Sequence, residues 1–157
     1  MKRRLIAVIG AGVADTATLD LAEEVGRRLA EAGCTLVTGG LGGVMEAASR
    51  GASLAGGLVI GILPTSLTRD ANPFVDVPIA TGMGDARNVI IASTAEAFVA
   101  VGGAYGTLSE MAFALKRGKT VVSLGSWKLG DDVKPASTPE EAVRLALEGD
   151  RGSTGSD

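Results

Sequence analysis

The chain has 157 residues, a net charge of -3 and 46% hydrophobic residues. This is enough for one domain with a buried core, and the acidic balance leaves no basic footprint for nucleic acid or an anionic membrane. Histidine is absent and Cys34 is the single cysteine, which excludes a disulfide within the chain, a histidine-dependent triad and a zinc site of clustered His and Cys. We therefore expect a cytoplasmic protein that spans no membrane and holds no metal.

The expected elements alternate between apolar strands and amphipathic helices. Residues 5–10 are a short apolar run that ends in glycine, which favours a buried strand over the apolar part of a signal peptide. Residues 18–32 have apolar side chains at helical spacing and stop at Gly33. The other expected elements are strands at 35–40, 58–63, 77–80, 97–102 and 120–125, and helices at 44–54, 86–94, 108–117 and from Pro139 to about Leu147.

This alternation predicts an α/β, Rossmann-like doubly wound fold, with a mostly parallel sheet of five or more strands flanked by helices. Residues 1–148 would form a single nucleotide-binding domain, and residues 149–157 a disordered tail. Ligands of such sheets bind beyond the carboxyl ends of the strands. Each glycine cluster of the chain follows a predicted strand: Gly10 and Gly12, then Gly39, Gly40, Gly42 and Gly43, then Gly102, Gly103 and Gly106.

Two of these loops have similar sequences, TGGLGGVMEAA (38–48) and VGGAYGTLSEMA (101–112). Glycines let backbone amides approach an anion, and a helix N-terminus adds favourable partial charge. The alternative is that tight strand-to-helix turns simply require glycine. Two such loops side by side favour a ligand, with Thr107 as a hydroxyl donor. The first loop, GAGVAD (10–15), lacks the third glycine of a dinucleotide fingerprint.

Two charged residues lie near these loops. Glu110 follows Thr107 at the spacing of a capping box, so it has a structural reading as well as a catalytic one. If Asp85 caps the helix at 86–94, Arg87 lies in the first turn, where a cation is disfavoured by the helix dipole. Arg87 is therefore either a clamp for an anion or one half of a surface ion pair.

The segment LVTGGLGGVMEAASRGASLAGGLVIGILP, followed by ARN and GGAYGTLSE, resembles the LOG family over about Ile6–Leu124. Its members were long labelled "possible lysine decarboxylase" and include cytokinin-activating phosphoribohydrolases. Within the superfamily, the short chain is most similar to the bacterial branch that resembles molybdenum cofactor carrier proteins.

The resemblance implies a Rossmann-like fold, a homodimer or larger homo-oligomer, and a nucleotide 5′-monophosphate or similar phosphorylated ligand, with no required cofactor. In the hydrolases the motif glycines and threonine hold phosphate; the matching residues here are Gly103, Gly106 and Thr107. The motif glutamate and an upstream arginine support cleavage of the base–ribose bond; the matching residues here are Glu110 and Arg87. The chain departs from the hydrolase pattern by having Val101 in place of proline, Asn88 in place of lysine and no Gly-Ser pair in its first loop.

The sequence is compatible with three functions. A phosphoribohydrolase would use Glu110 and Arg87 on a nucleoside monophosphate. A non-catalytic carrier or sensor would hold a phosphorylated cofactor, such as molybdenum cofactor, with the same loops. A structural module would use the small residues of 43–57 for helix packing, but leaves the glycine loops unexplained. Lysine decarboxylation has little chemical support, because no lysine lies in a glycine-loop element: the lysines are Lys2, Lys116, Lys119, Lys128 and Lys134.

Overall fold

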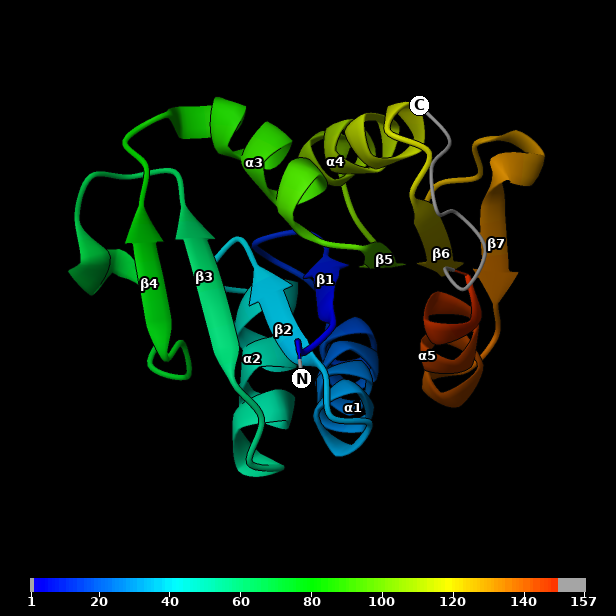
Figure 1. Cartoon of the computed structure of the whole chain (residues 1–157), viewed down its shortest axis with the longest axis horizontal. Helices are drawn as coiled ribbons and strands as arrows, with labels where there is room; N and C mark the ends of the chain where they lie inside the picture. Colours follow the sequence, from blue (N-terminus) through cyan, green and yellow to red (C-terminus); the bar gives the residue numbers. More distant parts are fainter. Residues whose placement is uncertain (1, 150–157) are drawn as a thin grey trace.

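A computed structural model describes residues 2–149 of the chain. Its centre is a seven-stranded, all-parallel sheet with the order β4-β3-β2-β1-β5-β6-β7 (Figure 1). The α/β, Rossmann-like fold expected from the sequence is therefore confirmed. The strands are β1 (Leu5–Ile9), β2 (Thr35–Thr38), β3 (Val59–Leu63), β4 (Val77–Ala80), β5 (Ala97–Val101), β6 (Thr120–Leu124) and β7 (Val133–Ala136).

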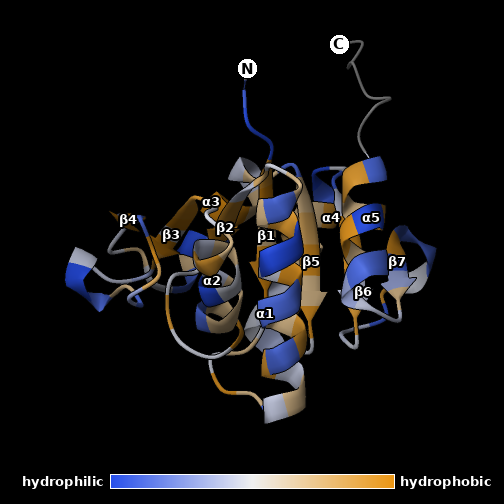
Figure 2. Cartoon of the chain, turned by 90° about the horizontal axis from the view of Figure 1, so that it is seen from below, coloured by the Kyte–Doolittle hydropathy of each residue, from blue (hydrophilic) through white to orange (hydrophobic). Residues whose placement is uncertain are grey.

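Five α-helices cover the two faces of the sheet. Helices α1, α2 and α5 pack on one face around Val25, Leu29 and Ala48, whereas α3 and α4 pack on the other around Ile91 and Met111 (Figure 1). Figure 2 shows hydrophilic residues on the outward side of α1 and mostly hydrophobic strands behind it. The helices are α1 (Thr16–Glu31), α2 (Val44–Leu54), α3 (Arg87–Thr94), α4 (Tyr105–Lys116) and α5 (Pro139–Glu148).

Local sequence signals set several of these boundaries. Thr138 caps α5 by accepting a hydrogen bond from the Glu141 amide at 3.1 Å, and Pro139 occupies the first turn. The Glu141 carboxylate in return accepts from the amide of Ser137 at 3.1 Å. The sequence therefore predicted this helix start correctly. None of the helices within residues 2–149 has the length and apolar character needed to cross a membrane.

One expectation about the sheet needs correction. The sequence reading omitted β7, which pairs with β6 in parallel and contains Pro135. Proline is tolerated there because β7 is an edge strand and no strand lies beyond it in the sheet. The strand expected at 77–80, inside a long loop, is confirmed as β4 at the other edge of the sheet. Apart from Gly149, the expected tail at 149–157 lies outside the described residues.

Candidate functional site

The point where the strand order reverses lies between β1 and β5. From β1 the chain proceeds outward through β2 to β4, and from β5 it proceeds in the opposite direction through β6 to β7 (Figure 1). Because all strands are parallel, the loops after β1, β2 and β5 leave the sheet at the same edge. This is the position at which doubly wound folds bind ligands, and it holds all three glycine clusters.

The loop after β5 leads into α4 without a side-chain cap. The helix begins at Tyr105 with Ala104 as its N-cap residue, and no side chain caps it. The capping-box interpretation of Thr107 and Glu110 is therefore wrong, because Thr107 is already the third residue of the helix. The amides of Tyr105, Gly106 and Thr107 lack an intrahelical partner, as the first turn of any α-helix does. These donors are available to an anion.

The glycines of this loop differ in what they do. Gly103 has φ +123°, and a Cβ on it would lie 2.6 Å from the Thr107 side chain. A Cβ on Gly106 would meet no atom within 4 Å, so packing does not require glycine there. Glycine costs an α-helix about 1 kcal/mol relative to alanine, which leaves the approach of a ligand to the backbone as a physical reason for Gly106. Thr107 is a buried residue, and its hydroxyl forms no hydrogen bond with any described residue.

The loop after β2 also ends in a helix without a side-chain cap. Gly43, the N-cap residue of α2, has φ +62°, and a Cβ there would lie 2.3 Å from the carbonyl oxygen of Ala11. The Val44 amide donates to that same carbonyl at 3.0 Å. The two loops therefore pack directly on each other. Gly42 lines their junction, where its Cβ would meet the carbonyl oxygen of Gly12 at 3.6 Å.

The loop after β1 has a different electrostatic character. Asp15 caps α1 by accepting a hydrogen bond from the Thr18 amide at 2.8 Å. Hydrogen bonding from Thr18 lowers the pKa of the Asp15 carboxyl, which keeps a negative charge at this helix N-terminus. The structure gives Gly10 a packing role, because a Cβ there would lie 2.7 Å from the Val101 carbonyl oxygen. The loop supports the other two, and contact of Gly10 or Gly12 with phosphate stays a prediction.

Arg87 reaches from α3 to the loop after β2. Its Nη1 donates to the carbonyl oxygens of Gly39 at 2.8 Å and Ile62 at 3.0 Å. A Cβ on Gly39 would lie 2.0 Å from that Nη1, so glycine is needed there for the guanidinium to fit. The surface ion-pair interpretation is wrong for the described residues, since Arg87 forms no salt bridge within 2–149. Burial lowers the pKa of Arg87, and Glu110 and Asp85 oppose that effect.

The expected cap of α3 by Asp85 is also wrong. Residues Gly84–Ala86 form a 3-10 turn that continues directly into α3, and no side chain caps the helix. Arg87 is the first residue of α3 and so lies in its first turn, as the sequence predicted. The 3-10 turn leads directly into this helix. Its cation is stabilised there by two carbonyl groups that come from other elements.

Glu110 lies on α4, one helical turn beyond the uncapped start. Its side chain is buried, with 9% of the residue exposed, and forms no hydrogen bond with the described residues. Burial raises the pKa of Glu110 to about 7, and the positive charge of Arg87 limits the rise. A carboxyl group with a pKa near neutrality can both accept and release a proton at physiological pH. The structure thus couples Glu110 electrostatically to Arg87.

Sequence reasoning missed what Asn88 contributes. The Ser109 hydroxyl donates to the Gly106 carbonyl at 2.7 Å, so it can only accept from the Asn88 side-chain amide at 3.3 Å. This orients Asn88 and leaves its buried Oδ1 without a partner among residues 2–149. The departure from the hydrolase motif at position 88 was visible in the sequence, but its contact with the α4 start was not. Asn88 thus links α3 to α4, the helix that contains Gly106 and Glu110.

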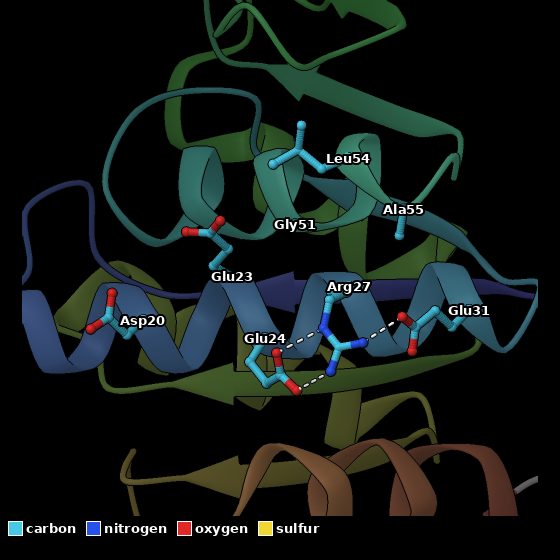
Figure 3. Close-up of a pocket in the computed structure, with 8 residues that line it drawn as sticks. All are labelled: Asp20, Glu23, Glu24, Arg27, Glu31, Gly51, Leu54 and Ala55. Atoms are coloured by element: carbon cyan, nitrogen blue, oxygen red, sulfur yellow. Dashed lines mark hydrogen bonds and ion pairs between the residues drawn. The ribbon is translucent and has the colours of Figure 1, made fainter.

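A hollow of about 360 Å³ lies on the outer surface between α1 and α2. Figure 3 shows Arg27 there between Glu24 and Glu31, joined to both by ion pairs. None of the predicted site residues lines it. Its lining is acidic, because Arg27 is the one cation beside Asp20, Glu23, Glu24 and Glu31, and this disfavours a phosphorylated ligand. Within residues 2–149, no group of His, Cys, Asp and Glu side chains is arranged to hold a metal ion.

A model of the SLOG cluster4 family matches residues 3–148. The chain belongs to this family. The structure of the chain is similar to that of the molybdenum cofactor binding protein from the phototrophic bacterium Rippkaea orientalis. The TM-score is 0.89 and the sequence identity 39%, and the match covers 94% of this chain and 98% of that one. The molybdenum cofactor carrier protein from Chlamydomonas reinhardtii gives a TM-score of 0.87 and 36% identity, with coverage of 94% of this chain and 98% of that chain.

A catalytic relative is also similar in sequence. The cytokinin riboside 5′-monophosphate phosphoribohydrolase LOG of Oryza sativa subsp. japonica is 38% identical over 96 residues, which are 59% of this chain and 39% of the rice protein. The LOG-like resemblance expected from the glycine motifs is therefore confirmed, as is the likeness to molybdenum cofactor carriers. These relatives thus include two molybdenum cofactor binding proteins and an enzyme.

Proposed function

We propose that this protein binds a small phosphorylated ligand, a nucleoside 5′-monophosphate or a similar molecule such as molybdenum cofactor, with its phosphate at the start of α4. The observation that carries the proposal is the contrast between the helix starts around the strand-order reversal. Asp15 occupies the start of α1, whereas α4 and α2 begin without a side-chain cap. An anion is stabilised at an uncapped helix N-terminus by the amide donors and the helix dipole.

The side chains around α4 fit this ligand. Gly106 leaves open space beside the first-turn amides, and the unpaired Thr107 hydroxyl can donate to a phosphate oxygen. The remaining guanidinium hydrogens of Arg87 lie on the same edge of the sheet and add positive charge. For molybdenum cofactor, these groups would hold the phosphate. The likeness to two molybdenum cofactor binding proteins supports this form of the proposal.

Binding is tested by comparing ligands that differ only in phosphate. Isothermal titration with AMP and adenosine, and with GMP and guanosine, is expected to show binding of the nucleotides alone. Gly106→Ala is expected to weaken nucleotide binding without destabilising the fold, because its Cβ meets no protein atom but enters the open space. Ala112→Ser, on the exposed side of the same helix, is the control. Equal affinity for nucleoside and nucleotide would overturn the proposal.

A second candidate function is hydrolysis of the base–ribose bond, and the buried, nearly neutral Glu110 is the observation that favours it. Its carboxylate would take a proton from a water molecule whose oxygen bonds to C1′, while the C1′–N bond breaks and the departing base takes up a proton from solvent; Glu110 then releases its own proton to solvent. Arg87 would stabilise the carboxylate and the phosphate. The partial match to the rice phosphoribohydrolase supports this candidate.

Release of free base separates the two candidates. A phosphoribohydrolase is expected to release base from at least one nucleoside monophosphate, and Glu110→Gln is expected to slow release by roughly 100-fold or more, the usual contribution of a general acid or base. Binding without release would leave the carrier function. Release that is unaffected by Glu110→Gln would remove Glu110 from the mechanism.

A further inference from the structure

The one tyrosine and the one tryptophan of the chain lie together at the start of α4. The rings of Tyr105 and Trp127 are stacked, with centroids 6.0 Å apart and an angle of 25° between their planes. Trp127 Nε1 donates to the Ala104 carbonyl oxygen at 3.0 Å, which ties the indole to the N-cap residue of α4. Trp127, itself fixed by this bond, therefore lies against one face of the Tyr105 ring.

The other face of Tyr105 is open. The residue is 81% exposed, although Trp127 beside it is half-buried. Burying an aromatic ring is favourable by several kcal/mol at about 25 cal/mol per Å². The Tyr105 ring stacks on Trp127 and is otherwise exposed to solvent, so it offers apolar surface to which a ligand can bind. A merely structural aromatic residue has no need of this exposure.

Tyr105 lines a pocket of about 610 Å³ between α3 and α4. Gly106 and Ser109 line the same pocket, so it is continuous with the proposed phosphate position. Phe113 and Val89 contribute apolar surface to it, and Asp85 a carboxylate. The volume lies within the range of small-molecule pockets and is far larger than a phosphate group needs. The pocket can hold the rest of the ligand.

We propose that Tyr105, held in place by Trp127, is a stacking platform for a planar heterocycle that is joined to the phosphate bound at α4. This inference rests on the proposed phosphate site and names the chemical class of its ligand, a heterocycle phosphate. Both purine nucleotides and pterin phosphates have this chemistry. An aromatic face recognises any flat π system, so stacking on Tyr105 gives affinity for the class.

The test compares ligands with and without the heterocycle. Isothermal titration measures affinity for GMP, 7,8-dihydroneopterin monophosphate and ribose 5-phosphate in the wild type, Tyr105→Ala and Tyr105→Phe. The wild type is expected to bind at least one heterocyclic ligand roughly 5- to 150-fold more tightly than ribose 5-phosphate, the range of one aromatic stacking contact. The preferred heterocycle distinguishes a nucleotide from a pterin source.

The two Tyr105 variants test whether the preference for a heterocyclic ligand comes from the aromatic ring of Tyr105. Tyr105→Ala is expected to abolish it while affinity for ribose 5-phosphate stays unchanged, and Tyr105→Phe is expected to keep it. Because Trp127 is the single tryptophan, its fluorescence should respond to the heterocyclic ligand and not to ribose 5-phosphate. Equal affinities in the wild type, or a preference that survives Tyr105→Ala, would overturn the platform while the phosphate site stands. Failure of all three ligands to bind would overturn both.

Discussion

Replacing Glu110 by glutamine is expected to change the pH dependence of stability in a defined direction. The folded-state pKa of Glu110 is about 7 and its ordinary value is 4.5, because burial disfavours the charged form. Below pH 4.5 the carboxyl is protonated in both the folded and the unfolded state, so its titration does not affect stability. As the pH rises from 4.5 to about 7, the unfolded chain releases the proton first, and the free energy of unfolding falls.

The size of the effect follows from the shift. At 1.36 kcal/mol per pH unit, a rise from 4.5 to about 7 corresponds to about 3 kcal/mol. The Glu110→Gln protein lacks this titration. Its free energy of unfolding, relative to the wild type, is therefore expected to increase by about 3 kcal/mol between about pH 4 and about pH 8.

Urea denaturation of both proteins across this pH range measures the difference. Ala112→Ser is the matched control, since it alters an exposed position of α4 and removes no titratable group. Its difference from the wild type is expected to be the same at every pH. A constant difference between Glu110→Gln and the wild type would refute the argument that Glu110 is buried and destabilised as an anion.

Three further variants test the neighbouring contacts. Gly39→Ala is expected to destabilise the fold by about 2–4 kcal/mol in urea denaturation, because its Cβ would lie 2.0 Å from Arg87 Nη1 and would break two hydrogen bonds; a loss below about 0.5 kcal/mol would contradict this contact. Arg87→Met is expected to raise the pKa of Glu110 further, since it removes the charge that lowers it, and a carbon-13 titration of the Glu110 carboxyl would detect no upward change if the two groups are uncoupled. Thr138→Ala is expected to cost about 1 kcal/mol through loss of the α5 cap, and unchanged stability would show that the bond to the Glu141 amide contributes nothing.

Much of the fold could be predicted from the sequence because its signals are local. The small-residue helix at Val44–Leu54 and the strand at Val77–Ala80 have the expected boundaries. The start of α4 could not be placed in this way. Gly106 is a poor helix former, so the pattern indicated a loop up to Leu108, whereas the helix begins at Tyr105. Helix propensity therefore predicted the start of α4 too late, because Gly106 lies inside the helix.

The contacts of the candidate site depend on residues far apart in the chain. Arg87 donates to carbonyl groups that are 48 and 25 residues away. No local spacing encodes such bonds, and backbone carbonyls carry no sequence signature. The burial of Glu110 likewise depends on the packing of α3 against α4. The residue types of the site could be selected from motifs, but their interactions required the fold.

The central claim is that phosphate binds at the uncapped start of α4. Titration of isotope-labelled protein with inorganic phosphate, followed by amide chemical shifts, tests it most directly. The account predicts saturable shifts that are largest for the amides of Tyr105, Gly106 and Thr107 and small at Thr18, whose amide is bonded to Asp15. The largest shifts at the start of α1, or no saturable shifts at α4, would contradict it.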